Sequence, residues 1–232
     1  MPKDARATRE RLLRAGARHF AADGIDAART RDVIATAGQG NDSAITYHFG
    51  SRAGLLEAIL RAGITRMEPA RAATLQALDD PCDLPGIVAA IVHPTADELH
   101  TEQGRDFLRI TAQLAGRAGI RDHHPPALLD GTSLARQLEL LESACRAVLP
   151  EPLALERIAI AIAFLTTALA DRTGRLDPTT PQHTLLDHHT FVADLTTMLT
   201  AALQAPAPPQ TSLRNHPPPH TVNPSPRGGA VR

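Results

Sequence analysis

The sequence predicts an all-α protein. Apolar residues recur at helical spacing along most of the 232 residues, and no run of alternating β-branched residues indicates a strand. Glycines and prolines separate these periodic segments. With 43% apolar residues, the chain has enough apolar side chains to bury a full core.

The N-terminal region predicts two helices of different length. The first covers residues 5–22, and Gly24 follows it at the position where a left-handed residue ends many helices. The second covers 29–36 and buries Val33 and Ile34 as its apolar contacts. We expect both helices to share one small core.

A glycine-dependent turn at 37–40 leads into a third helix. This helix begins at Asn41 or Asp42, because either side chain can accept a hydrogen bond from the free N–H groups of a first turn. It lasts about two turns before Gly50 ends it. A fourth helix, predicted over 51–66, then connects this unit to the rest of the chain.

The rest of the folded chain predicts a helical body. Proline residues separate its helices, which we expect at 84–100 with a break near Pro94, 103–118, 127–148, 153–173 and 184–204. Residues 206–232 are rich in proline and poor in large apolar side chains, so we expect disorder there. The expected domains are 1–50, 51–205 and 206–232.

Charge is distributed unevenly along the chain, although the net charge is only −1. Residues 1–66 carry 11 Lys/Arg against 7 Asp/Glu, whereas residues 67–205 carry 10 against 18. This asymmetry favours contact between the N-terminal unit and a polyanion, with the acidic body held away from it.

Cysteine content and hydropathy limit the class of protein. Cys82 and Cys145 are the only cysteines and have no metal-ligand spacing, so neither a disulfide framework nor a thiolate zinc site is indicated. The uncharged stretch at 158–170 is shorter than the roughly 20 residues that span a bilayer. We therefore expect a soluble, unexported, cytoplasmic protein.

Two short helices joined by a glycine turn, after a longer helix in a basic segment, predict a helix-turn-helix unit that reads the DNA major groove. Across residues 7–60 the chain resembles the TetR (tetracycline-repressor) family of transcriptional regulators. The residues that carry this resemblance are Leu12, Ala15, Phe20, Gly24, Val33, Ala37-Gly38, Ile45, Tyr47-His48-Phe49, Ser51-Arg52 and Leu55-Leu56. The resemblance implies a dimeric regulator, usually a repressor, that binds a pseudo-palindromic operator and is released by a small-molecule ligand.

Helix geometry divides the residues of the third helix into two faces. Ile45 and Phe49 are four residues apart and share the core face. The residues expected to reach base edges are Ser43, Ala44, Thr46 and Tyr47. The residues expected to bind phosphates are Arg29, Thr30, His48 and Arg52, and Asn41 reads bases if the register shifts.

The body is expected to hold a ligand pocket and a dimer interface. Candidate pocket residues from helix faces are Phe107, Thr111, Leu114, Leu138, Leu141, Phe164 and Thr167. The segment 156–170 is apolar almost all round, so it must be buried on two sides. The helices at 153–173 and 184–204 could pair with a symmetry mate, or they could be core helices of a monomer.

The chain has eleven histidines, which make metal binding a further possibility to consider. Asp122-His123-His124 and Asp187-His188-His189 lack recurrent ligand spacing, so we interpret them as helix-edge residues and predict no metal or cofactor. His93 and His100 could line a pocket. The chain is not expected to be an enzyme. The alternatives are a small helical enzyme that uses histidine-rich metal sites in its body, and an adaptor whose N-terminal unit contacts protein.

Overall fold

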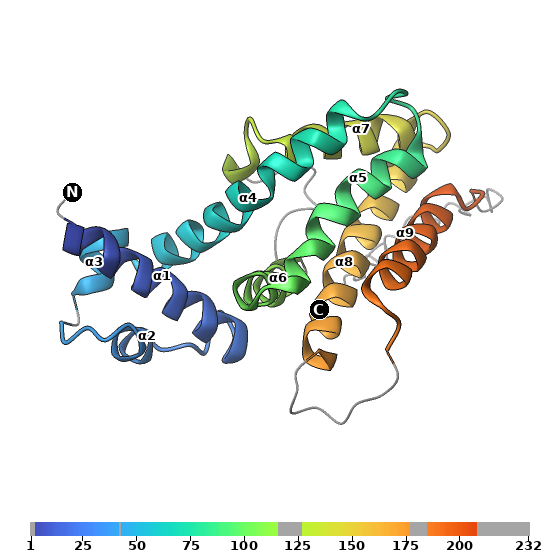
Figure 1. Ribbon diagram of the computed structural model, residues 1–232. Helices are drawn as coiled ribbons and strands as arrows, with labels where there is room; N and C mark the ends of the chain where they lie inside the picture. Colours follow the sequence, from blue (N-terminus) through green and yellow to red (C-terminus); the bar gives the residue numbers. More distant parts are fainter. Residues whose placement is uncertain (1–2, 42, 116–126, 177–184, 208–232) are drawn as a thin grey trace, which may run out of the picture.

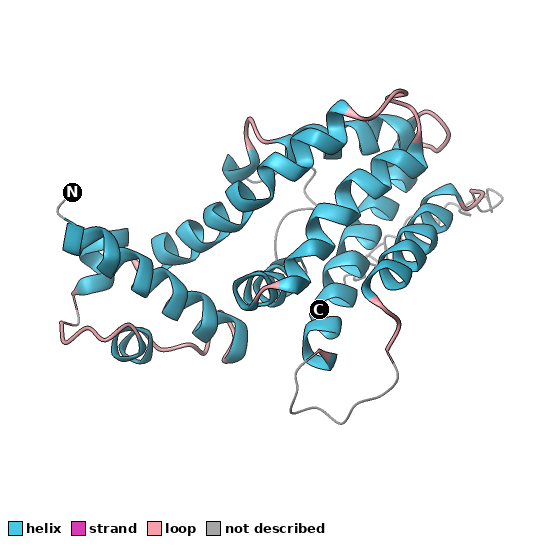
Figure 2. Cartoon of the chain, in the orientation of Figure 1, coloured by secondary structure: helices cyan, strands magenta, loops and turns pink. Residues whose placement is uncertain are grey.

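The computed structural model describes residues 3–41, 43–115, 127–176 and 185–207. All regular elements within these ranges are helices, so the predicted all-α fold class is confirmed (Figure 2). The chain begins in a compact N-terminal unit at one end of the molecule and finishes its helices at the other end (Figure 1). The predicted disordered tail lies outside these ranges from residue 208 onward.

The N-terminal unit consists of α1 (Lys3–Ala22), α2 (Thr30–Thr36) and α3 (Ala44–Phe49). Its apolar side chains form one buried cluster, the N-terminal core. The largest members of this core are Leu12, Phe20, Ile25, Val33, Ile34, Ile45, Leu55, Ile59 and Ile110. Gly24, Gly38 and Gly50 all have positive φ, as a side chain-free residue allows, and each follows one of the three helices. The predicted helix ends at these glycines are confirmed.

The fourth helix, α4 (Arg52–Gln76), is longer than the predicted 51–66. Ser51 caps it as expected, since its Oγ accepts a hydrogen bond from the N–H of Gly54 at 3.0 Å. The helix continues through Pro69 because the turns on both sides of this proline are anchored by buried Met67 and Arg71. One helix therefore starts in the N-terminal core and ends inside the body.

The body contains the remaining helices, arranged beside and beyond the far half of α4 (Figure 1). Their bounds are α5 (Leu84–Ala96), η1 (Asp97–His100), α6 (Glu102–Ala115), η3 (Ala127–Leu129), α7 (Ser133–Arg146), α8 (Glu151–Arg175) and α9 (His188–Gln204). Their buried apolar residues form a second cluster, the body core, which includes Ile87, Leu108, Leu141, Leu169 and Leu195.

Three predicted helix bounds in the body are wrong for local reasons. The break expected near Pro94 does not occur, because α5 is buried around that residue and ends only at Ala96. The helix predicted over 127–148 begins at Ser133, since Gly131 has a φ of 72° and Thr132 caps the first turn. The last helix begins at His188 rather than residue 184 because Asp187 caps it.

The helix α6 joins the two clusters. Leu108 belongs to the body core, and Ile110, two residues later, belongs to the N-terminal core. The side chain of Gln113 adds polar contacts to the same junction: its Nε2 donates to the carbonyl of Phe20 at 3.0 Å, and its Oε1 accepts from the N–H of Ile25 at 2.8 Å. The body is therefore attached to α1 and to the loop that precedes α2.

Candidate nucleic-acid interface

The turn between α2 and α3 is organised by side-chain as well as backbone hydrogen bonds. Gly38 has a φ of 66°, and the Oδ1 of Asn41 accepts from the N–H and the Oγ of Ser43 at 2.9 and 2.8 Å. This local turn delays the helix, so the predicted start at Asn41 or Asp42 is wrong and α3 begins at Ala44. Asp42 lies outside the described residues.

The outer face of α3 is polar and open. Ser43 and Thr46 are exposed, and Tyr47 has 76% of its surface accessible, although it is the only tyrosine in the chain. The inner face is held by Ile45, which is buried, and by Phe49, which packs against the N-terminal core. A short helix thus presents a hydroxyl and a phenol outward from a rigid apolar base.

Ala44 does not lie on the outer face with its neighbours. Only 8% of its surface is accessible, and it belongs to the N-terminal core. Its small side chain lets the first turn of α3 approach the core closely. The expectation that Ala44 points outward is therefore wrong, and the exposed face is narrower than the sequence suggests.

His48 is half-buried at the edge of α3. Its ring meets the ring of Tyr47 edge to face, with centroids 4.8 Å apart and an interplanar angle of 84°. Its Nδ1 is buried and has no hydrogen-bond partner within the described part of the chain. The nitrogen that could meet a ligand outside the fold is therefore Nε2.

Arg52 makes internal contacts that the sequence does not indicate. Its Nη2 donates to the carbonyl of Ala28 at 3.0 Å and also to that of Ile25. Its guanidinium lies 4.9 Å from the centre of the Phe20 ring. Arg52 therefore fastens the loop before α2 to α1 and α4, whereas the sequence places it among the phosphate ligands.

The beginning of α2 is open to solvent. Arg29 occupies the N-cap position, is exposed, and makes no side-chain capping hydrogen bond. Thr30 follows it and is half-buried. A helix start without a side-chain cap, next to an exposed arginine, is suited to a phosphate group.

A cavity of about 260 Å³ lies where α1 and α2 meet the start of α6. Its charged walls are Arg11, Arg14 and Arg18 on one side and Glu102 and Asp106 on the other. Arg18 and Glu102 form an ion pair across the junction. Burial raises the pKa of the Asp106 carboxyl, and Arg109 opposes that shift. No sequence motif indicates this junction, because its partners are more than 80 residues apart.

The seven candidate pocket residues do not form one site. Leu141 lies in the body core, and Leu114 packs against the N-terminal core. Phe164 and Thr167 are exposed on α8. Phe107 is buried under Arg66, whose guanidinium lies 5.9 Å from the ring centre, and Thr111 and Leu138 are half-buried. Helix faces alone do not show which residues a bundle brings together.

Residues 12–59 match the model of the bacterial regulatory proteins of the TetR family. The N-terminal unit of the chain is that of a TetR-family regulatory protein. The matched segment of this TetR-family regulator begins at Leu12 and ends at Ile59, which are both buried in the N-terminal core. The match therefore covers the second half of α1, all of α2 and α3, and about the first third of α4.

Several solved structures are similar to this TetR-family regulator over most of its length. A Rhodococcus protein assigned to the TetR family is 21% identical, with a TM-score of 0.47, covering 85% of this chain and 97% of that one. The superantigen PfiT is 17% identical, with a TM-score of 0.46 and the same coverage. A Streptomyces coelicolor protein described as a transcriptional regulator is 21% identical, with a TM-score of 0.45, covering 83% and 96%. Among curated proteins, none matches the sequence.

Proposed function

We propose that this TetR-family regulator is a homodimer that represses transcription by binding a pseudo-palindromic operator, one α3 helix per half-site. The exposed face formed by Ser43, Thr46 and Tyr47 carries this proposal, because it sits on a short helix whose other face is fixed in a core. Hydroxyl groups on such a helix can hydrogen-bond to base edges in the major groove. A regulator of this kind acts on cytoplasmic DNA.

Phosphate contacts position this helix in the groove. The exposed Arg29 and the open start of α2 support one contact, and the Nε2 of His48 supports another. Arg52 contributes indirectly, because its bonds to Ile25 and Ala28 set the position of α2. The net positive charge of residues 1–66 favours the approach of the same end to DNA.

The proposed dimer forms through α8 and α9. Ile160 and Phe164 are one turn apart on α8 and leave 59% and 42% of their surface accessible, and Met198 on α9 leaves 43%. By length and composition α8 could also cross a membrane, and only 22% of its most apolar window is buried in the single chain. Pairing with a second copy would cover this apolar face and stabilise it by about 25 cal/mol per Å² of apolar surface buried.

For an effector to control DNA binding, the body must change the position of the two α3 helices of the dimer. The contacts of α6 with α1 and with the loop before α2 offer the path, because a shift of α6 moves the carbonyl of Phe20 and the N–H of Ile25 that Gln113 holds. Coupling of this kind typically amounts to about 1–3 kcal/mol. We therefore place effector control at the α1–α6 junction rather than in the seven-residue pocket.

Selection of bound sequences from a random DNA pool tests this function. We expect an enriched inverted repeat with half-site centres about 34–36 Å apart or a multiple of that spacing. The Thr46→Ala variant should lose discrimination within each half-site. Enrichment of no sequence, or of one half-site bound by a single chain, would contradict the proposal.

A further inference from the structure

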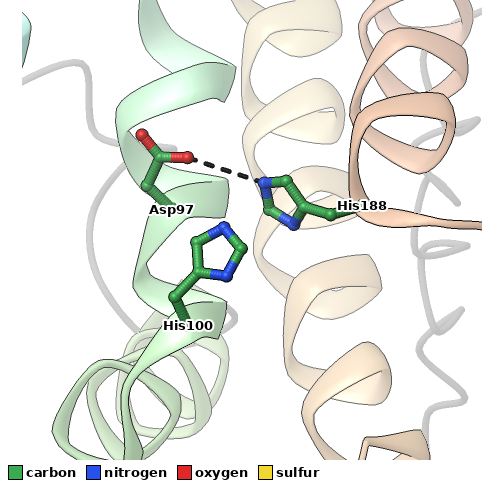
Figure 3. A group of neighbouring side chains, drawn as sticks. All are labelled: Asp97, His100 and His188. Carbon is green, nitrogen blue, oxygen red and sulfur yellow. Dashed lines mark ion pairs between the residues drawn. The ribbon is translucent and has the colours of Figure 1, made fainter.

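Three side chains from two distant segments meet where η1 lies beside α9. Asp97 and His100 come from η1, and His188 is the first residue of α9. One potential ligand atom from each lies within 4.8 Å of the other two. The Nε2 of His188 is 3.5 Å from the Oδ1 of Asp97, and the rings of His100 and His188 have centroids 4.2 Å apart (Figure 3).

Local backbone geometry brings the first two residues together. A 3₁₀-helix has three residues per turn, so positions i and i+3 lie above one another on the same face. Asp97 and His100 have this spacing in η1. On a regular α-helix the same two side chains would diverge by about 60°. The short 3₁₀ segment after α5 therefore places Asp97 and His100 on the same face, where both can reach one metal ion. In an α-helix the same spacing would separate them.

The start of α9 is fixed by its own contacts, and this places the third side chain. The Oδ1 of Asp187 accepts from the N–H of Thr190 at 2.9 Å, and its Oδ2 accepts from the Oγ1 of Thr190 at 2.6 Å. Buried Arg172 donates to the carbonyl of Leu186. His188 is held between these anchored residues. In the Asp187-His188-His189 triplet, then, Asp187 is a helix cap, as a helix-edge residue can be, whereas His188 faces η1.

We propose that Asp97, His100 and His188 bind one divalent transition-metal ion, with Zn²⁺ the best fit. Two imidazole nitrogens and one carboxylate oxygen are a ligand set that Zn²⁺ accepts, typically at about 2.0–2.2 Å from the metal. Ligand atoms around such an ion lie roughly 3.3 Å apart, so small rotamer changes close this site from its present span. Asp97 and His100 are exposed, which leaves a fourth position open to water or to another ligand.

The other Asp-His-His segment of the sequence, Asp122-His123-His124, lies outside the described residues. Within the ranges that the structure describes, the fold brings together one group of three potential metal ligands, which are Asp97, His100 and His188. The prediction of no metal rests on the spacing of ligands along the sequence. Such spacing does not reveal a site in which Asp97 and His100 meet a third ligand, His188, that is 88 residues further along the chain.

The site lies at a point where a bound ion would act on the whole molecule. Glu98, between two of the ligands, accepts from the Nε of Arg66 on α4 at 3.0 Å. The next helix after η1, α6, pairs Glu102 with Arg18 and holds Phe20 through Gln113. An ion that ties α9 to η1 therefore links α9, which belongs to the proposed dimer interface, to α4 and α6, the helices that pack on the N-terminal unit. This second step rests on the proposed function.

Titration of the tag-free, metal-stripped full-length chain with Co²⁺ tests the site, because a four-coordinate Co²⁺ ion absorbs visible light strongly. We expect one ion per chain. His188→Ala and His100→Ala should each weaken binding by more than the roughly 10–100-fold that loss of an outer partner costs. His189→Ala is the matched control, since this exposed neighbour is outside the cluster, and it should bind like the wild type. Equal titrations for His188→Ala and the wild type, with both variants folded by circular dichroism, would overturn the site.

Operator binding with and without Zn²⁺ tests the second step separately. We expect Zn²⁺ to change the affinity of the wild type for its operator about 5- to 150-fold and that of His188→Ala much less. If Co²⁺ binds but the operator affinity does not change, the ion is structural and the coupling is overturned. If no operator is bound in either metal state, the proposed function fails while the Co²⁺ titration still decides the metal site.

Discussion

The N-terminal unit and the body differ in what their interiors contain. The N-terminal core is built of apolar side chains, whereas every buried polar or charged side chain among the described residues lies at position 71 or beyond. In the body, Arg71 donates to Gln137 at 2.7 Å and to Thr95 at 2.8 Å, and Gln137 donates to the carbonyl of Ala90 at 2.9 Å. An apolar core needs only shape, but this polar network needs specific partners on three helices.

The difference indicates different tolerance to change. An apolar core accepts volume-conserving substitutions at modest cost, but a buried network fails when one member is lost. Burial lowers the pKa of Arg71 to about 10, so this side chain is still charged at neutral pH and its charge is buried. The body is therefore the part of the molecule where single polar substitutions should do the most damage.

The largest effect is expected from Arg71→Ala. Loss of the guanidinium leaves the Oε1 of Gln137 and the Oγ1 of Thr95 without their donor and empties the buried space of a large side chain, so it should lower the free energy of unfolding by about 3–5 kcal/mol, as measured by urea denaturation. Arg136→Ala is the control, because its ion pair with Glu139 is exposed and should be worth less than about 1 kcal/mol. Equal losses for the two variants would show that the network is not a special feature of the body.

The second prediction concerns the outer face of the body. Phe164→Glu should convert the proposed dimer to a monomer at micromolar concentration, because it places a charge in the apolar interface of α8. Sedimentation velocity measures the mass directly. Val148→Glu is the control, because it introduces the same charge at an exposed residue that lies between α7 and α8, outside the proposed interface. A monomeric wild type, or a dimer that survives Phe164→Glu, would refute the interface.

A third prediction separates two arginines of the N-terminal unit. Arg52→Ala leaves the carbonyls of Ile25 and Ala28 without their donor and should cost about 1–3 kcal/mol of stability by urea denaturation. Arg29→Ala should change stability by less than about 0.5 kcal/mol and instead reduce the salt slope of operator binding by about one unit. If Arg52→Ala kept full stability and lowered the salt slope, Arg52 would be a phosphate ligand as its sequence position suggests.

The fourth prediction tests the exposed face of α3. Thr46→Ala should reduce the preference for operator over random DNA by about 1–3 kcal/mol and leave the salt slope unchanged, because a base contact carries sequence information and a phosphate contact does not. Competition binding with the two DNAs measures the preference. Thr65→Ala, at an exposed position on α4, should leave both quantities unchanged. An equal loss of affinity for both DNAs would show that Thr46 contacts the sugar-phosphate backbone of the DNA and not a base.

The smallest effect is expected at the junction of the two regions. Because burial raises the pKa of Asp106, the folded chain loses stability as the pH rises from the ordinary value of 3.8 through the raised pKa. Asp106→Asn removes this loss, so its urea midpoint should exceed that of the wild type at neutral pH, and the difference should vanish below pH 3.8. Asp171→Asn breaks an exposed pair with Arg175 and should show no such pH dependence.

The same contrast explains how much the sequence could predict. In the N-terminal unit, signals are local: a glycine with positive φ follows each helix, and Ser51 caps the helix that follows it directly. The start of α3 was mispredicted because Asn41 bonds to Ser43 instead of capping the helix, a choice between two local hydrogen bonds. The contacts of Arg52 join residues 24 and 27 positions apart, beyond the range of any helical period.

In the body, most of the missing information concerns pairs of segments. The polar partners of Arg71 are 24 and 66 positions away, and His188 meets residues of η1 across most of the body. Pro94 is compatible with either a break or a continued helix, and the burial of its neighbours decides the outcome. Helix number followed from periodicity, but the residues that face one another depend on how the helices pack.

The position of α6 decides which piece of this chain can fold by itself. A fragment that stopped at Gln76 would leave the N-terminal core open to water at the place of Ile110, and the carbonyl of Phe20 would lose its donor on Gln113. The shortest piece that keeps the reading helix in a closed core therefore reaches Ala115, well past the segment matched to the family. For the same reason, heating should melt both regions in a single cooperative transition, because neither core keeps all its residues once α6 has left.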